Sequence, residues 1–142
     1  MQLLASAGIK QEPTVGGKRY LVNVFSGEAT RQFSGSGRYG AGVLVSIDRS
    51  WGDHSVDSII PRRASVENPF NASFFISYEQ LLGKFSIPVQ LGVYVVEKYY
   101  GEALYQNFGL RYHMNRNWST GIYLKTHFGH ADYIHAGIGY RF

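Results

Sequence analysis

The sequence predicts an all-β protein, and three observations support this class. Apolar and polar residues alternate with a period of two in six segments, which gives each segment one apolar and one polar face, as in a strand. The chain has 17 glycines, 11 tyrosines and 9 phenylalanines, a composition that suits short strands and tight turns. Helical spacing of apolar residues is not sustained in any segment. With 142 residues, we expect one β-domain over residues 1–142.

We expect eight strands along the chain. Two weaker segments come first, at residues 2–9 and 18–27, and the second has Tyr20, Val22 and Val24 in phase. The six clearer segments are 39–48, 70–79, 84–95, 104–114, 118–128 and 134–142. Their apolar faces are rich in β-branched and aromatic residues, which favour strands.

The predicted connections alternate in length from the second strand on. Residues 28–33, 80–83 and 115–117 form short connections, whereas 49–69 and 98–102 form longer ones. The last connection, 129–132, falls on the long side but is short. An even number of antiparallel strands, with short turns at one end and longer loops at the other, is typical of outer-membrane barrels.

The alternation does not show whether the apolar face points into a soluble core or outward to lipid, but the composition of the polar face helps to decide. That face carries glycines such as Gly92 and Gly121 among serines, asparagines and tyrosines, and few lysines or glutamates. This mixture suits the lumen of an eight-stranded barrel, which is just wide enough for side chains to fill. We therefore predict an eight-stranded antiparallel up-and-down transmembrane β-barrel. The alternative is a soluble lipocalin-like barrel with its apolar face turned inward.

The last residues add to the membrane prediction. The segment 135–142 resembles the terminal strand of bacterial outer-membrane barrels, with aromatic residues at Tyr140 and Phe142. We accordingly expect a location in the bacterial outer membrane. Met1 to Ser6 lack the basic start and long apolar core of a signal peptide. If the protein is exported, we expect this chain to be its processed part or a shortened form of it.

Several classes of protein are excluded by composition. The chain contains no cysteine, which excludes disulfide scaffolds, thiolate metal sites and cysteine nucleophiles. No stretch approaches the ~20 apolar residues of a membrane-spanning helix. We expect no nucleic-acid partner, because the sequence has no basic patch interleaved with stacking aromatic residues.

Histidines near the last connection are the first candidates for chemistry. His127 and His135 have the same lumen-facing parity, and a hairpin centred on Ala131 would make them direct cross-strand partners. With His130 and Asp132 in the loop, they would form an acid–base pair or a weak metal site. The alternative, which we favour on spacing alone, is a hydrogen-bond network of polar lumen residues. We expect neither a metal ion nor a cofactor.

Basic residues form a second, weaker set of candidates. They lie in segments assigned to the external end of the barrel: Lys10, Lys18, Arg49, Arg62, Arg63 and Lys98. Arg and Lys bind phosphates by charge-assisted hydrogen bonds, so these residues are candidates for contact with lipopolysaccharide. Asp53, Asp57 and Glu67 are interleaved with them, and an ordinary solvated loop explains the pattern equally well.

The final strands resemble a known family. Leu110–Tyr112, Leu124–Phe128, Ala131–Ile134 and Gly137–Phe142 are similar to the C-terminal strands of the lipid A 3-O-deacylases, eight-stranded outer-membrane barrels related to proteins often called acyloxyacyl hydrolases. The resemblance extends over about residues 74–142. It implies outer-membrane lipid and lipopolysaccharide as partners.

The resemblance also implies a site. The family uses a histidine base, a serine two residues later and a glutamate on the last strand that orients the histidine. His127 matches the base, whereas Gly129 stands at the serine position and His135 at the glutamate position. The nucleophile is therefore unknown, and His135 and Asp132 are the candidates for orienting His127. Two functions stay open: a deacylase that cleaves an acyl ester of lipid A, and a non-catalytic, lipid-binding or structural barrel that has lost the chemistry.

Overall fold

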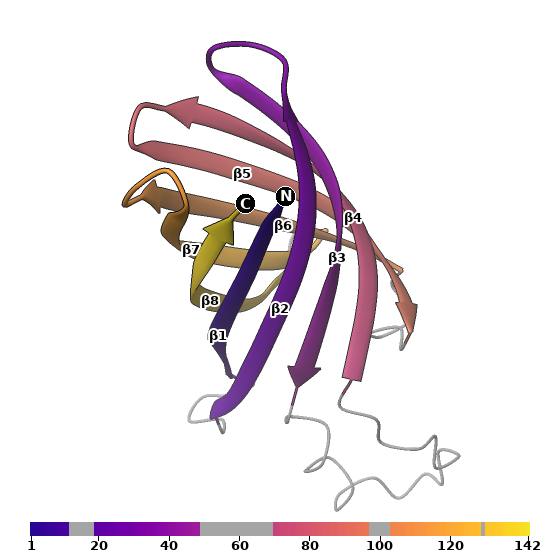
Figure 1. Ribbon diagram of the computed structural model, residues 1–142. Coiled ribbons are helices and arrows are strands. Elements are labelled where there is room, and N and C mark those ends of the chain that lie inside the picture. Colours follow the sequence, from indigo (N-terminus) through magenta and orange to yellow (C-terminus); the bar gives the residue numbers. More distant parts are fainter. Residues whose placement is uncertain (12–18, 49–69, 97–102, 129) are drawn as a thin grey trace, which may run out of the picture.

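The chain folds into a closed β-barrel, seen in a computed structural model that describes residues 1–11, 19–48, 70–96, 103–128 and 130–142 (Figure 1). The strands are β1 (Gln2–Gln11), β2 (Arg19–Gln32), β3 (Gly37–Asp48), β4 (Phe70–Leu82), β5 (Phe85–Val96), β6 (Leu104–His113), β7 (Trp118–His127) and β8 (His130–Arg141). Each strand pairs antiparallel with the next along the chain, and β1 pairs antiparallel with β8 to close the barrel. The predicted fold class is confirmed.

Both termini lie at the end of the barrel that carries the short turns (Figure 1). Closure places Gln2 opposite Arg141, and the amide of Phe142 donates to the carbonyl oxygen of Met1. A closed barrel leaves no strand edge, so every strand finds backbone partners within the protein, as lipid requires. Among the residues that the structure describes, no helix is long and apolar enough to cross a membrane.

The apolar face of the strands points outward. Phe74, Leu91 and Ile122 have exposed fractions of 57%, 44% and 60%, whereas Gly92 and Gly121 are buried in the lumen. The lipocalin-like alternative, with the apolar face inward, is therefore wrong. An apolar outer belt around a polar lumen is the arrangement of a transmembrane barrel.

Two of the predicted short connections, 28–33 and 80–83, are shorter in the structure. β2 continues through Glu28 to Gln32, so the predicted connection 28–33 is mostly strand. Glu28 lies in the polar lumen, where it accepts a hydrogen bond from Ser77. β4 extends to Leu82, which leaves a tight turn at Gly83 with a φ of +67°. The predicted connections 49–69 and 98–102 lie outside the described residues.

The hairpin between β7 and β8 is also tighter than predicted. β7 ends at His127 and β8 begins at His130, so the connection is two residues long and not the predicted 129–132. Phe128 has a φ of +38°, the left-handed conformation that two-residue hairpin turns demand. The pairing register also shifts between Lys125 and Thr126. Together these features change which residues of the two strands lie opposite one another.

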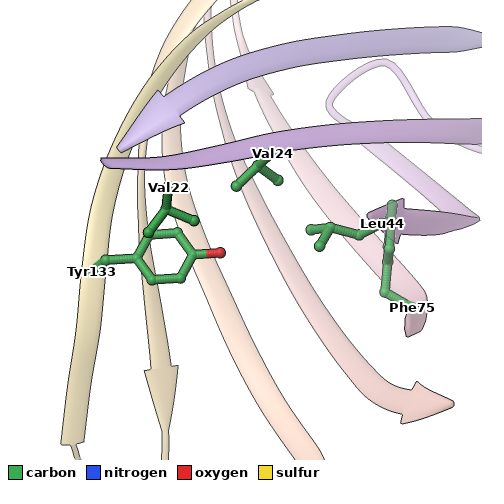
Figure 2. Packing of buried hydrophobic residues seen from close by; sticks show 5 residues of the cluster. All are labelled: Val22, Val24, Leu44, Phe75 and Tyr133. Carbon is green, nitrogen blue, oxygen red and sulfur yellow. The ribbon is translucent and has the colours of Figure 1, made fainter. Parts of the chain in front are cut away.

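The lumen is filled in two zones. Toward the short turns, Glu79 accepts hydrogen bonds from Arg38, Ser86 and Arg111 at 2.9, 2.6 and 2.8 Å, all buried inside the barrel. In the other half a small apolar cluster occupies the lumen (Figure 2). Its members, contributed by β2, β3, β4 and β8, are Val22, Val24, Leu44, Phe75 and Tyr133.

Candidate functional site

The site lies at the end of the barrel opposite the two termini, around His127 at the end of β7. The ring of His127 faces the lumen and is only 5% exposed. Its Nε2 lies 3.1 Å from the hydroxyl oxygen of Tyr94 on β5. The two rings are nearly parallel, with an interplanar angle of 14° and centroids 5.9 Å apart. A hydroxyl group therefore lies within reach of the ring nitrogen that a general base uses.

The other ring nitrogen of His127 faces a carboxylate. Nδ1 lies 3.8 Å from Oδ2 of Asp132, which is near the start of β8. The second carboxylate oxygen of Asp132 forms an ion pair with Nζ of Lys10 on β1, at 3.1 Å. Both side chains are largely buried, with exposed fractions of 7% for Asp132 and 11% for Lys10. Lys10 thus holds Asp132 in place beside the histidine.

The order Asp132–His127–Tyr94 has chemical consequences. A carboxylate near Nδ1 favours the tautomer that carries its proton on Nδ1, which leaves Nε2 free of hydrogen and able to accept a proton. The Nδ1–carboxylate distance is longer than a hydrogen bond, but such contacts are often long without substrate and tighten when it binds. A carboxylate, a histidine base and a hydroxyl group therefore lie in the spatial order that nucleophilic catalysis uses.

A buried cation adjoins this group. Lys125 lies two residues before His127 on the same face of β7 and is 1% exposed. Its Nζ lies 4.7 Å from the ring centroid of Tyr94 and 4.1 Å from that of Tyr105. The ring of Tyr133 is also near, at 5.6 Å. Aromatic faces attract an ammonium group, and this attraction is strongest where water is excluded.

His135 does not take part in this group. The register places His130 opposite His127 and Tyr123 opposite His135, so the predicted pairing of His127 with His135 is wrong. The tight hairpin is the reason, because it centres on 128–129 and not on Ala131. The difference puts His135 four residues further along the barrel, about 13 Å at ~3.3 Å per residue.

His135 belongs to a separate buried contact. Its Nδ1 lies 2.8 Å from Oγ of Ser6, and its ring stacks on that of Tyr123 with centroids 5.0 Å apart. Its Nε2 is buried and has no hydrogen-bond partner among the described residues.

An apolar groove of about 550 Å³ lies on the barrel wall beside the site. Small residues, including Ala7, Gly8 and Ala136, hollow the wall between the larger Leu124 and Ile134. Asp132 is one of the residues that line the same groove. The residue whose carboxylate faces His127 therefore also borders this groove.

The basic residues predicted to meet lipopolysaccharide have mixed outcomes. Lys10 is described, and its ammonium group is paired with Asp132 as part of the site. The remaining members of that set, Lys18, Arg49, Arg62, Arg63 and Lys98, lie outside the described residues. Among the residues whose positions are described, no group of three or more His, Asp or Glu side chains could hold a metal ion.

Sequence reasoning missed two members of the site. Lys125 shares the parity of His127 two residues away, and this spacing was a usable signal. Tyr94 also has lumen-facing parity, but β6 lies between β5 and β7, so only the curvature of the closed barrel brings Tyr94 to His127.

The fold and the site define a class: a transmembrane β-barrel with an acid–base–hydroxyl group at one end of its lumen. A model of the family described as acyloxyacyl hydrolase, C-terminal domain, matches residues 1–142. The chain therefore belongs to this family, the PagL-type acyloxyacyl hydrolases. Comparisons with curated proteins and with solved structures gave no match.

Proposed function

We propose that this barrel resides in the bacterial outer membrane and hydrolyses an acyl ester of lipid A. Membership of the acyloxyacyl hydrolase family supports ester hydrolysis at a lipid. The apolar belt, with residues such as Phe74 and Ile122 exposed, supports a position among lipid chains. Lipid A, the lipid part of lipopolysaccharide, is the proposed substrate. Its acyl esters lie in a membrane leaflet, which agrees with the family's ester hydrolysis and with the apolar belt of the barrel.

The observation that carries the proposal is the pair of contacts around His127. Asp132 lies on the Nδ1 side and a hydroxyl group lies on the Nε2 side, at 3.8 and 3.1 Å. In the proposed reaction His127 acts as general base, and Asp132 orients its ring and stabilises the imidazolium that forms. His135 is not assigned to the reaction, because the register separates it from His127.

The adjoining groove supports a lipid substrate. Most of its lining residues, from β1, β7 and β8, are apolar, and Asp132 is among them. In the proposed complex an acyl chain lies along this wall with its ester end toward Asp132. Holding the substrate beside the base lowers the entropic part of the barrier.

Mass spectrometry of lipid A tests the proposal. Refolded protein in detergent is incubated with purified lipid A, and the loss of one acyl chain is measured over time. His127→Asn should lower the rate about 100-fold or more, the range of general-base catalysis. His113→Asn is the matched control, because His113 is a histidine at the other end of the barrel, where its Nε2 lies 2.9 Å from Oγ of Ser86. Heat-modifiable gel mobility establishes that both variants are folded.

The outcome separates the two functions. Wild-type protein whose heat-modifiable gel mobility shows a folded barrel, but which leaves the acyl number unchanged, would be a non-catalytic barrel. Equal rates for the wild type and His127→Asn would remove His127 from the reaction while leaving the hydrolase in place.

A further inference from the structure

The family position for the nucleophile holds no hydroxyl in this chain, because Gly129 stands there. The structure nevertheless brings a hydroxyl to His127 from a different strand. Tyr94 Oη lies 3.1 Å from Nε2 of His127, within the distance that a base and its nucleophile need. We propose that Tyr94 is the nucleophile of this hydrolase and is transiently acylated. This inference rests on the proposed ester hydrolysis and adds the residue that attacks the substrate.

Tyr94 differs in its hydrogen-bond partner from two other lumen tyrosines, Tyr105 and Tyr123. Tyr105 shares a hydrogen bond with Ser73 at 2.9 Å, and the hydroxyl of Tyr123 accepts one from Arg111 at 3.0 Å. Tyr94 has a histidine instead, and a histidine can remove the phenolic proton. Among these three tyrosines, Tyr94 alone has a base in contact with its hydroxyl.

A buried cation lies over the ring of Tyr94. Nζ of Lys125 lies 4.7 Å from the Tyr94 ring centroid, in a buried setting where water screens little. Negative charge that develops on the phenolic oxygen is therefore stabilised by Lys125. The proton that leaves goes to His127, and the imidazolium is stabilised in turn by Asp132.

The reaction then proceeds in two balanced steps. Tyr94 Oη attacks the acyl carbonyl carbon while its proton moves to His127 Nε2. The bond between that carbon and the sugar oxygen breaks, and the sugar oxygen takes the proton from His127. The product is an acyl ester of Tyr94 and a free sugar hydroxyl. In the second step a water molecule gives a proton to His127 and attacks the carbonyl carbon of the tyrosyl ester. The bond between that carbon and Tyr94 Oη breaks, which releases the fatty acid, and His127 returns the proton to Tyr94 Oη.

The second step is favourable for a tyrosyl ester. A phenol has a pKa of about 10, far below that of an aliphatic alcohol, so phenolate is the better leaving group. The acyl-enzyme should therefore hydrolyse more readily than the original lipid ester. Water is the co-reactant of the second step, and the balance needs no oxidant or reductant.

The test combines one substitution with one trapping measurement. Tyr94→Phe removes only the hydroxyl oxygen and should lower lipid A deacylation at least 100-fold. The control is Tyr39→Phe, an exposed tyrosine on the outer face of β3 near the short turns, which should leave the rate within twofold. Heat-modifiable mobility establishes that each variant is folded.

Trapping uses the wild-type protein and does not depend on any variant folding. A 4-nitrophenyl acyl ester has such a good leaving group that hydrolysis of the acyl-enzyme becomes the slow step. A burst of nitrophenol is then expected, the kinetic sign of a covalent intermediate. After an acid quench, peptide mass spectrometry should find the acyl group on Tyr94.

Each result has one meaning. Loss of activity in Tyr94→Phe together with acylated Tyr94 supports the proposal. A Tyr94→Phe variant that deacylates lipid A at the wild-type rate overturns it and leaves the hydrolase standing. A quenched wild type without acyl group on Tyr94 also overturns it, whatever the variant does. A folded wild type without any ester hydrolysis overturns both this inference and the proposed function.

Discussion

Replacing Glu79 with glutamine removes one negative charge from the centre of the lumen and keeps the side-chain volume. Glu79 is buried and accepts hydrogen bonds from Arg38 and Arg111 through different carboxylate oxygens, at 2.9 and 2.8 Å. Glutamine has one acceptor oxygen and one amino group. If its oxygen faces Arg111 and Ser86, its amino group faces the donor of Arg38, and the contact becomes repulsive.

The magnitude follows from the burial of the group. Both guanidinium groups stay in the barrel without their carboxylate, and removing one partner of a buried ion pair costs about 3–5 kcal/mol. With a urea dependence of about 2 kcal/mol per molar, the midpoint of unfolding should fall by about 2 M.

Urea unfolding of the barrel in phospholipid vesicles, followed by tryptophan fluorescence, measures this shift. Arg116→Gln, an exposed turn residue, is the control and should change the free energy of unfolding by less than about 0.5 kcal/mol. If the urea midpoint of Glu79→Gln falls by less than ~0.5 M, the loss of stability is about 1 kcal/mol or less, which is the value of an exposed ion pair. That result would refute the reasoning.

Three further predictions concern the wall and the site. Ile122→Lys places a charge on the outer face and should destabilise the barrel in vesicles by about 2–4 kcal/mol; an unchanged urea midpoint would argue against a lipid-facing position. Gly92→Ala adds a methyl group that overlaps the Tyr105 ring and should cost about 1–3 kcal/mol in the same assay, whereas Gly35→Ala, with open space around it, should not. Asp132→Asn should slow lipid A deacylation about 10⁴-fold if it orients the base as in a catalytic triad, and a loss below tenfold would assign that role elsewhere.

Strand positions were predictable because alternation is a local property. Residues 84–95 were predicted and β5 occupies Phe85–Val96, with the same face turned outward. Prediction failed at the ends of strands, where local chemistry misleads. Residues 28–33 were predicted as a connection, yet β2 continues to Gln32, and the lumen accepts the side chain of Glu28.

The site was only partly predictable. His127 came from the resemblance, and Asp132 was one of two candidates for orienting it. The turn at Phe128 placed Asp132, and not His135, near His127, since a change of two or three residues in turn position changes every cross-strand partner. Tyr94 could not be deduced, because its contact with His127 spans strands that are not hydrogen-bonded to each other.

The sequence by itself determined the eight alternating strands and the existence of one apolar and one glycine-rich polar face. Both follow from the side-chain geometry of single strands, which neighbouring residues specify. The composition of the polar face and the terminal strand also predicted that the apolar face is outside, which the exposed Phe74, Leu91 and Ile122 confirm. Only the tertiary structure decided that Tyr94, His127 and Asp132 meet. That meeting depends on the register summed around all eight strands, and no local stretch of residues contains that information.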